Sequence, residues 1–149
     1  MIRRFIKYWL PVLLWLALIF SASADKGSGH RSSRIIAPIV RWFVPNISQR
    51  NLDRIVHTVR KTAHVTEYAI LALLLFRALA SKPKEDASFP LRAAIFAFGL
   101  AALYAMTDEF HQTFVPSREG QVSDVIIDSF GAALALFAVY LVGRWRKRW

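Results

Sequence analysis

Four apolar stretches divide the chain, and polar segments separate them. The stretches cover about residues 8–24, 63–80, 91–107 and 122–143. Each approaches the roughly 20 residues that an α-helix needs to cross the hydrocarbon core of a membrane. The pattern therefore predicts an all-α membrane protein in which residues 1–149 form a single domain, a bundle of four transmembrane helices.

The second apolar stretch follows a basic, amphipathic segment. Ser48 is a residue type that caps helix N-termini, and apolar residues recur at helical spacing from there to Leu79. Residues 68–76 are wholly apolar, whereas the half before them carries most of the charge. We expect one long helix that starts in the membrane interface and enters the membrane near His64.

The loop between the first two stretches has two parts. Residues 25–33 are rich in Gly and Ser, which predicts a flexible turn. Residues 34–45 are apolar with spaced arginines. We expect this interfacial segment to lie in the membrane surface, with Pro38 and Pro45 limiting its helical length.

The first stretch imitates a secretory signal peptide, because it follows a basic start and ends in the small residues 21–24. Its full span length and the bulk of Trp9 and Trp15 favour a retained transmembrane helix instead.

Composition restricts the function classes further. The 149 residues are 55% hydrophobic with a net charge of +10, and the mean hydropathy is +0.33. The chain is too apolar for an ordinary soluble domain. Its basic residues flank the apolar stretches, where they suit anionic lipid headgroups and form no nucleic-acid-sized patch. Membrane lipids are therefore the expected partners, and nucleic acid is not. The absence of cysteine excludes disulfides and thiolate chemistry.

Four spans place both termini on one side of the membrane. With the termini inside, 11 of the 20 Lys and Arg residues are inside and 9 are outside. Most of the outer ones belong to the long, partly interfacial first loop, so the two basic tails set the orientation. We expect both termini in the cytoplasm, and the polar segment 108–123 on the outer face.

Ionisable residues lie at the edges of the apolar stretches, where charge is costly and a function is the first suspicion. On the second helix, Lys61, His64 and Tyr68 share a face, and Glu67 lies beside it. A basic helix that only contacts headgroups is the simpler explanation, but it suits Glu67 poorly. An ionisable side chain beside an apolar run should face the bundle interior and have a partner.

A second polar group follows the third stretch. Asp108, His111 and Gln112 share a helical face, whereas Glu109 is expected to point elsewhere. If the protein is an enzyme, Asp108, Glu109 and His111 are the acid–base candidates. The residues leave open whether it is one.

The fourth stretch begins with two more carboxylates, Asp124 and Asp128, one helical turn apart. Asp124 suits the first turn of a helix, where negative charge is favourable, but Asp128 lies deeper. Arg118 is the obvious partner, since a guanidinium can bridge two carboxylates. We expect it to pair with Asp108, Asp124 or Asp128, and such a network can be purely structural.

The same residues offer enough ligands for a metal ion. The set is rich in oxygen donors, which suits Mg²⁺ or Ca²⁺ as readily as Zn²⁺. Neither H-x-x-E at 64–67 nor D-E-x-H at 108–111 is the H-E-x-x-H zinc motif, so the residues specify no cofactor. We expect the two polar groups to converge into one pocket on the outer leaflet, with Tyr68 and Phe114 as apolar walls.

Four pieces of the sequence together resemble the VanZ-like family of bacterial membrane proteins. Their order and spacing cover most of residues 9–135. This chain has Asp128, Ser117 and Ala135 where family members often have Asn, Gly and Gly; the extra carboxylate favours Arg118 pairing or cation binding. The pieces are Trp15 with residues 19–21, Lys61-x-x-His64-x-x-Glu67-Tyr68, Asp108-Glu109-x-x-Gln112-x-Phe114-x-Pro116-x-Arg118, and Asp124-Val125-x-x-Asp128-x-x-Gly131.

The resemblance implies a small helical protein of the bacterial cytoplasmic membrane. The family's named member is associated with low-level resistance to the glycopeptide antibiotic teicoplanin, and the family supplies no established reaction. We expect a cell-envelope protein that binds or modulates a lipid-linked cell-wall precursor or a lipidated glycopeptide. The alternatives are a lipid-headgroup enzyme, with or without a metal ion, and a structural partner of another membrane protein. The expected binding residues are Lys61, His64, Glu67, Tyr68, Asp108, Glu109, Gln112, Phe114, Arg118, Asp124 and Asp128.

Overall fold

Helices make up most of the described chain. The structure, a computed structural model, describes residues 2–24, 28–80, 88–115 and 120–147. No strand occurs within these ranges, so the all-α prediction is confirmed for them. The helices are α1 (Ile2–Tyr8), α2 (Leu10–Ala24), α3 (Ser28–Phe43), α4 (Gln49–Leu79), α5 (Leu91–Gln112) and α6 (Val122–Trp145).

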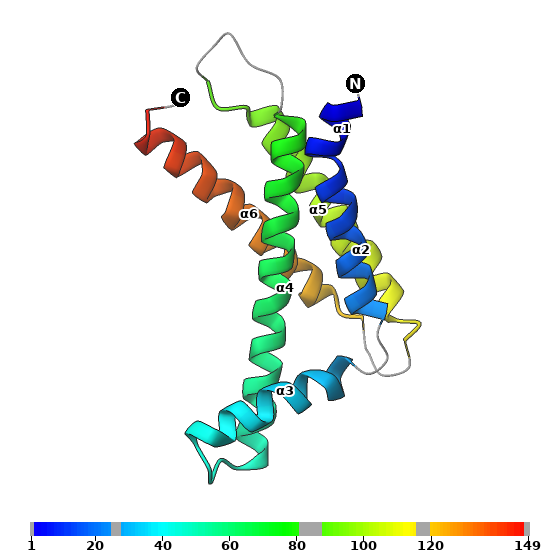
Figure 1. Cartoon of the computed structure of the whole chain (residues 1–149), viewed down its shortest axis with the longest axis vertical. Helices are drawn as coiled ribbons and strands as arrows, with labels where there is room; N and C mark the ends of the chain where they lie inside the picture. The colour runs from blue at the N-terminus through cyan, green and yellow to red at the C-terminus, as the bar shows by residue number, and fades with distance from the viewer. Residues whose placement is uncertain (1, 25–27, 81–87, 116–119, 148–149) are drawn as a thin grey trace.

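The central helix of the bundle is α4. It packs most extensively against α6 and α5, and α2 lies against both α4 and α5 (Figure 1). α1 and the end of α6 lie at one end of the bundle, and α3 crosses the opposite end of α4. Such an arrangement fits an even number of membrane crossings.

Three helices, α4, α5 and α6, are long and apolar enough to cross a membrane. α1 and α2 make a fourth span if this bent pair is counted as one, so the bundle has three spans or up to four. The two helices meet at a bend of 40°. Pro11 explains the bend, because proline lacks the N–H that would bond to Lys7 and its ring presses on the preceding turn.

The first helical segment starts at Ile2 rather than at residue 8 as predicted. Contacts with α4 account for the extension. Arg77 donates a hydrogen bond to the Lys7 carbonyl oxygen at 3.3 Å. Arg77 and Lys7 also lie over the Tyr8 ring, each 5.3 Å from its centroid, which holds this basic segment on the bundle.

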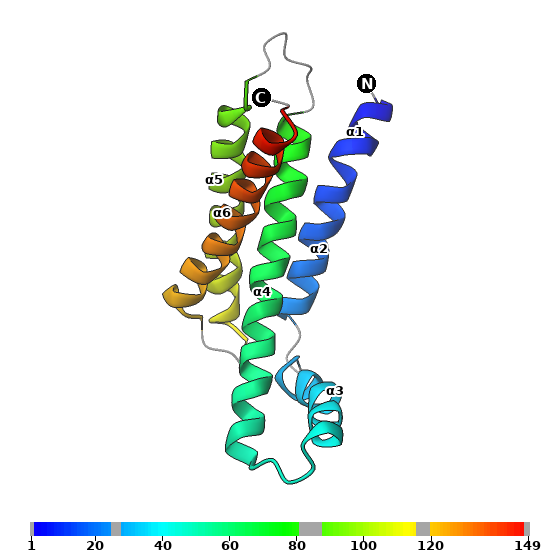
Figure 2. The same ribbon diagram turned by 90° about the vertical axis from the view of Figure 1, so that its left-hand side faces the viewer.

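α4 confirms the long helix predicted from Ser48. The Ser48 hydroxyl oxygen accepts a hydrogen bond from the Asn51 N–H at 3.4 Å, and the helix continues to Leu79. Its 31 residues span about 46 Å at 1.5 Å per residue, more than the roughly 30 Å of membrane hydrocarbon. The first half therefore projects beyond the other spans and meets α3 (Figure 2).

α3 corrects two expectations about the first loop. Residues 28–33 are helical rather than a flexible turn, and Pro38 lies inside the helix without ending it; residues 25–27 lie outside the described ranges. A proline removes one backbone hydrogen bond, so a helix can continue past it with a bend. Ile35, Ile39 and Trp42 recur at helical spacing and are exposed, which suits the expected position in a membrane surface.

α5 continues to Gln112, five residues past the predicted span 91–107, and so includes the helical face predicted for Asp108, His111 and Gln112. Asp108, Glu109 and Gln112 therefore belong to a helix, and all three are buried. Their side chains find partners inside the bundle, which stabilises this last turn. α6 begins at Val122, as predicted.

Small residues allow close approach of the helices. Alanines three or four residues apart, from Ala94 to Ala105, line the buried face of α5. In α6, a Cβ at Gly131 would lie 2.5 Å from the carbonyl oxygen of Val65. The backbones of α4 and α6 are thus in direct contact one residue after His64.

Replacing Gly131 with alanine should force α4 and α6 apart, because the new Cβ has no room beside Val65. Overpacking of this kind costs about 1–3 kcal/mol, and we expect the free energy of unfolding in detergent to fall by that amount. Gly99→Ala is the matched control, since nothing lies within 4 Å of a Cβ at Gly99. Equal stability of the two variants would contradict the close contact.

Candidate functional site

Polar side chains gather where α2, α4, α5 and α6 meet, at the end of the bundle away from α1. Asp108 and Glu109 of α5 are 4% and 5% exposed, and Asp128 of α6 is 1% exposed. Gln112 and Ser23 are buried with them. Three carboxyl groups thus share a region with little access to water, where charge and unpaired polar atoms are costly.

Asp108 joins three helices through one carboxyl oxygen. Its Oδ2 accepts hydrogen bonds from the Ser23 hydroxyl of α2 at 2.8 Å, the Tyr68 hydroxyl of α4 at 3.3 Å and Gln112 Nε2 of α5 at 3.2 Å. The other oxygen, Oδ1, makes no hydrogen bond in the described part of the chain. Asp108 is therefore the polar centre of this end of the bundle.

The expectation that Glu109 points away from Asp108 is wrong. Gln112 Nε2 also donates to Glu109 Oε1 at 3.2 Å, and the Gln121 backbone N–H donates to Glu109 Oε2 at 2.9 Å. Successive residues of a helix can both be buried when neighbours cover it on two sides. Gly120 allows this approach, because a Cβ there would collide with the Glu109 carbonyl oxygen.

Asp128 has a different environment. Neither of its carboxyl oxygens makes a hydrogen bond with any described residue. His64 Nδ1 lies 3.9 Å from Asp128 Oδ2 and 4.0 Å from Glu67 Oε2. His64 thus stands between a carboxyl group of α6 and one of its own helix, as the shared face on α4 predicts.

Lys61 and Asp124 connect the same two helices nearer the surface. The Lys61 amine lies 2.5 Å from Asp124 Oδ1, and the two side chains are 32% and 31% exposed. Asp124 occupies the first turn of α6 as expected, but its carboxylate pairs across to α4. Arg118, the cation expected to bind these carboxylates, lies outside the described residues, as does Ser117.

Two predicted site residues are not part of the cluster. The His111 ring packs against Phe20, with centroids 4.9 Å apart. Phe114 is 69% exposed and packs against Phe110. Phe114 therefore lies away from the buried carboxyl groups, because the chain has left α5 at Gln112 and this ring turns outward. Tyr68, its expected counterpart, is fully buried.

Sequence reasoning misses Ser23, which bonds directly to Asp108. A hydroxyl near the end of an apolar helix is a weak signal, since Ser21 in the same helix only donates to the Ala17 carbonyl oxygen. Trp15 enters the sequence argument through its bulk and through the family resemblance, and neither predicts its hydrogen bond. Its indole N–H donates to the Glu67 carbonyl oxygen at 2.9 Å, which fixes α2 to α4 beside the site.

Two hollows open beside the polar cluster. A cavity of about 120 Å³ lies between the end of α2, the start of α3 and α4, and its walls include Ser23, Arg60, His64 and Glu67. A more open groove of about 500 Å³ follows α4 on the side of α2. Ala63 and Glu67 belong to the walls of both. The polar cavity and the largely apolar groove therefore adjoin.

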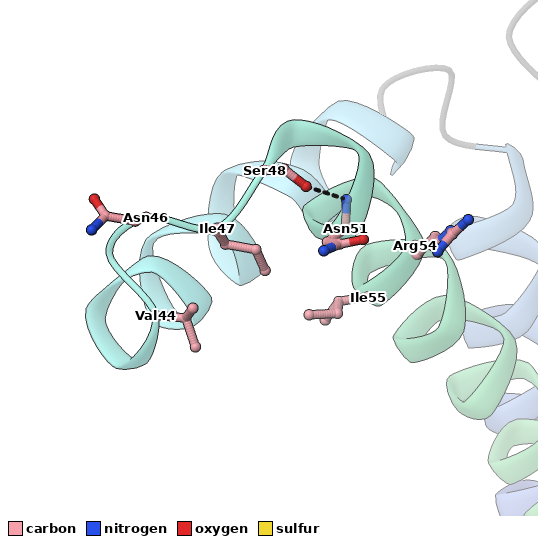
Figure 3. A pocket seen from close by; sticks show the side chains of 7 residues that line it. All are labelled: Val44, Asn46, Ile47, Ser48, Asn51, Arg54 and Ile55. Atoms are coloured by element: carbon pink, nitrogen blue, oxygen red, sulfur yellow. Dashed lines mark hydrogen bonds between the residues drawn. The ribbon is translucent and has the colours of Figure 1, made fainter.

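A third hollow, of about 600 Å³, lies at the turn between α3 and α4. Figure 3 shows Val44, Ile47 and Ile55 beside the capping bond of Ser48. None of the buried carboxyl groups lines it. In the described ranges, the polar cluster included, no three His, Cys, Asp or Glu side chains are grouped so as to hold a metal ion.

Removing the Ser23 hydroxyl should destabilise the bundle, because the buried Asp108 carboxylate loses a donor. A hydrogen bond to a charged group contributes about 1.5–3 kcal/mol, and we expect Ser23→Ala to lower the free energy of unfolding in detergent by that amount. Ser21→Ala is the matched control, since Ser21 is exposed and bonds within α2; it should change stability by under about 0.5 kcal/mol. Equal losses in both variants would mean that Ser23 acts through its own helix and not through Asp108.

Comparison with known proteins shows that the helices and the polar cluster belong to one family pattern. The family model described as VanZ/LLP1 matches residues 8–143, a range that includes the whole polar cluster. No curated protein and no solved structure matches the chain. Since a single family match runs from the end of α1 into α6 and covers the motifs that converge around Asp108 and Asp128, the chain belongs to the VanZ/LLP1 family.

Proposed function

We propose that this VanZ/LLP1-family protein binds an amphiphile of the bacterial cell envelope at the outer leaflet of the cytoplasmic membrane. The candidates from the sequence are a lipid-linked cell-wall precursor and a lipidated glycopeptide such as teicoplanin. One observation carries the proposal, namely the junction of a polar cavity with an apolar groove beside the buried carboxyl groups.

The groove offers a place for an acyl or prenyl chain. Trp15 and Ile70 line it within α2 and α4, and Val59 extends it toward the end of the bundle where α3 lies. The bond from Trp15 to the Glu67 carbonyl oxygen makes this groove a fixed feature of the packing. A chain already dissolved in lipid gains little from moving into a groove. The polar headgroup of the amphiphile must therefore determine which ligand binds.

The cavity supplies the polar contacts for that head. It lies at the end of α2, and Arg60, His64 and Glu67 bring charge and hydrogen-bonding groups into its wall. Mostly apolar sites with a few placed polar groups are typical of ligand binding. An amphiphile with its chain in the groove would place the part of its head nearest the chain in this cavity.

Binding is better supported than catalysis on a headgroup. Asp108 Oδ2 and both Glu109 carboxyl oxygens accept hydrogen bonds from inside the bundle. His111 packs against Phe20. None of these three acid–base candidates is among the described residues that line the cavity.

Filling the junction of cavity and groove should displace the ligand. Ala63→Phe places a ring in the wall that both hollows share, whereas Ala138→Phe adds the same ring to an exposed position of α6. We expect native mass spectrometry of gently extracted protein to show an amphiphile on the wild type and on Ala138→Phe. Retention by Ala63→Phe should be lower by about tenfold, equivalent to 1.4 kcal/mol.

The control variant decides between the explanations. Equal retention by Ala63→Phe and Ala138→Phe would place the amphiphile elsewhere on the bundle. A wild-type protein that retains no amphiphile, including added teicoplanin, would favour a structural partner of another membrane protein.

The outer-leaflet location requires both termini in the cytoplasm. The chain has no cysteine, so labelling of a single introduced cysteine shows on which side of the membrane that one position lies. Asn46→Cys, in the exposed turn between α3 and α4, should react with a membrane-impermeant thiol reagent in intact cells. Ser88→Cys, exposed near the start of α5, should react only after lysis. The reverse labelling pattern would move the site to the inner leaflet.

A further inference from the structure

We propose that the cavity between α2, α3 and α4 takes a zwitterionic headgroup, a phosphate joined to a primary ammonium, as in an aminophospholipid. This inference rests on the amphiphile site proposed above and names the chemistry of its head. Arg60 holds the phosphate and Glu67 holds the ammonium, with the lipid chain in the adjoining groove.

Arg60 supplies the anion-binding half of the cavity. It lines the cavity wall and is only partly exposed. Within the described chain it forms no hydrogen bond or ion pair. A guanidinium without a carboxylate partner presents its donors to a ligand, and its planar fork matches two phosphate oxygens.

Glu67 supplies the cation-binding half. It lies two helical turns after Arg60, and both residues line the same cavity. Its side chain is 24% exposed, and its Oε2 lies 4.0 Å from His64 Nδ1, so an ammonium would bind this carboxylate beside His64. A primary ammonium offers three donors and a compact positive charge, which suits a carboxylate in such a site.

The carboxyl groups behind the cavity disfavour a purely anionic head. In the cavity wall, Ser23 donates to Asp108 at 2.8 Å and His64 lies 3.9 Å from Asp128. Glu67 and Arg60 therefore bring one negative and one positive side chain into the cavity wall, and the carboxyl groups of Asp108 and Asp128 lie behind Ser23 and His64. A head that carries both charges matches this arrangement, whereas a phosphate alone meets acidic groups without a counter-charge of its own.

The volume of the cavity restricts the head to a small one. About 120 Å³ is well below the roughly 300–1,000 Å³ of pockets for drug-sized ligands. A saccharide head would have to remain outside the cavity, next to α3. A phosphate joined to a short amine is a headgroup small enough for this volume.

The test compares lipids on the full-length wild-type protein in detergent, by native mass spectrometry. Phosphatidylethanolamine, phosphatidylglycerol and phosphatidylcholine with identical acyl chains compete at equal concentration. We expect retention of phosphatidylethanolamine to exceed that of phosphatidylglycerol by about tenfold, because the latter has the phosphate without an ammonium. Phosphatidylcholine keeps the positive charge but lacks N–H donors, so it should fall between them.

Two variants separate the halves of the cavity. Glu67→Gln should bring the retention of phosphatidylethanolamine down to that of phosphatidylglycerol. Arg60→Gln should lower the retention of both. Arg50→Gln and Asp53→Asn change exposed residues of the same helix that do not line the cavity, and they should leave all three retentions unchanged.

The outcomes distinguish this inference from the proposed function. Equal wild-type retention of phosphatidylethanolamine and phosphatidylglycerol would overturn the headgroup assignment and leave the amphiphile site standing, and this comparison requires no variant to fold. Retention of none of these lipids and of no added teicoplanin by the wild type would overturn both. Retention of phosphatidylethanolamine that Ala63→Phe does not reduce would overturn the location of the head in this cavity.

Discussion

Burial of carboxyl groups in an apolar bundle is the constraint on which this structure depends. Spanning helices cannot expose such groups to hydrocarbon, so the groups must face inward and find donors. Asp108 meets this requirement by accepting hydrogen bonds from Ser23, Tyr68 and Gln112, which come from three helices. Polar atoms therefore fix the packing of α2, α4 and α5 at one end of the bundle. Close backbone contact at Gly131 fixes α4 against α6.

Helix positions could be predicted from the sequence wherever the deciding chemistry is local. Ser48 marks the start of α4 because a capping side chain bonds to a backbone N–H three residues away. The end of α5 depends instead on residues distant in the chain. Glu109 and Asp108 stay helical because they bond to Gln121 and to Ser23. The same limit explains α3, whose helix continues through Pro38 where the composition predicts a break.

The candidate site could be predicted to the extent that helical faces determine it. The face shared by Lys61 and His64 does meet the carboxylates of α6, because α4 and α6 pack along each other. Glu109 shows where this reasoning fails. The reasoning assumes that only one face of a helix is buried, whereas Glu109 is buried on a second face of α5. Phe114 lies beyond the end of α5, where helical spacing no longer applies. The hydroxyl of Ser23 is only a weak local signal, because its hydrogen bond to Asp108 forms only when α2 is placed beside α5.

The groove along α4 is open at exposed positions such as Val59 and Ala63, on a helix that is long and apolar enough to span a membrane. An amphiphile bound here as proposed would arrive by lateral diffusion within its leaflet and would never need to enter water. Its occupancy would be set by its mole fraction among the surrounding lipids, not by its concentration in the medium. Abundant lipids would compete continuously with rarer amphiphiles for the same place. A change in the lipid composition of the leaflet would therefore change the loaded fraction of the protein without any change in its intrinsic affinity.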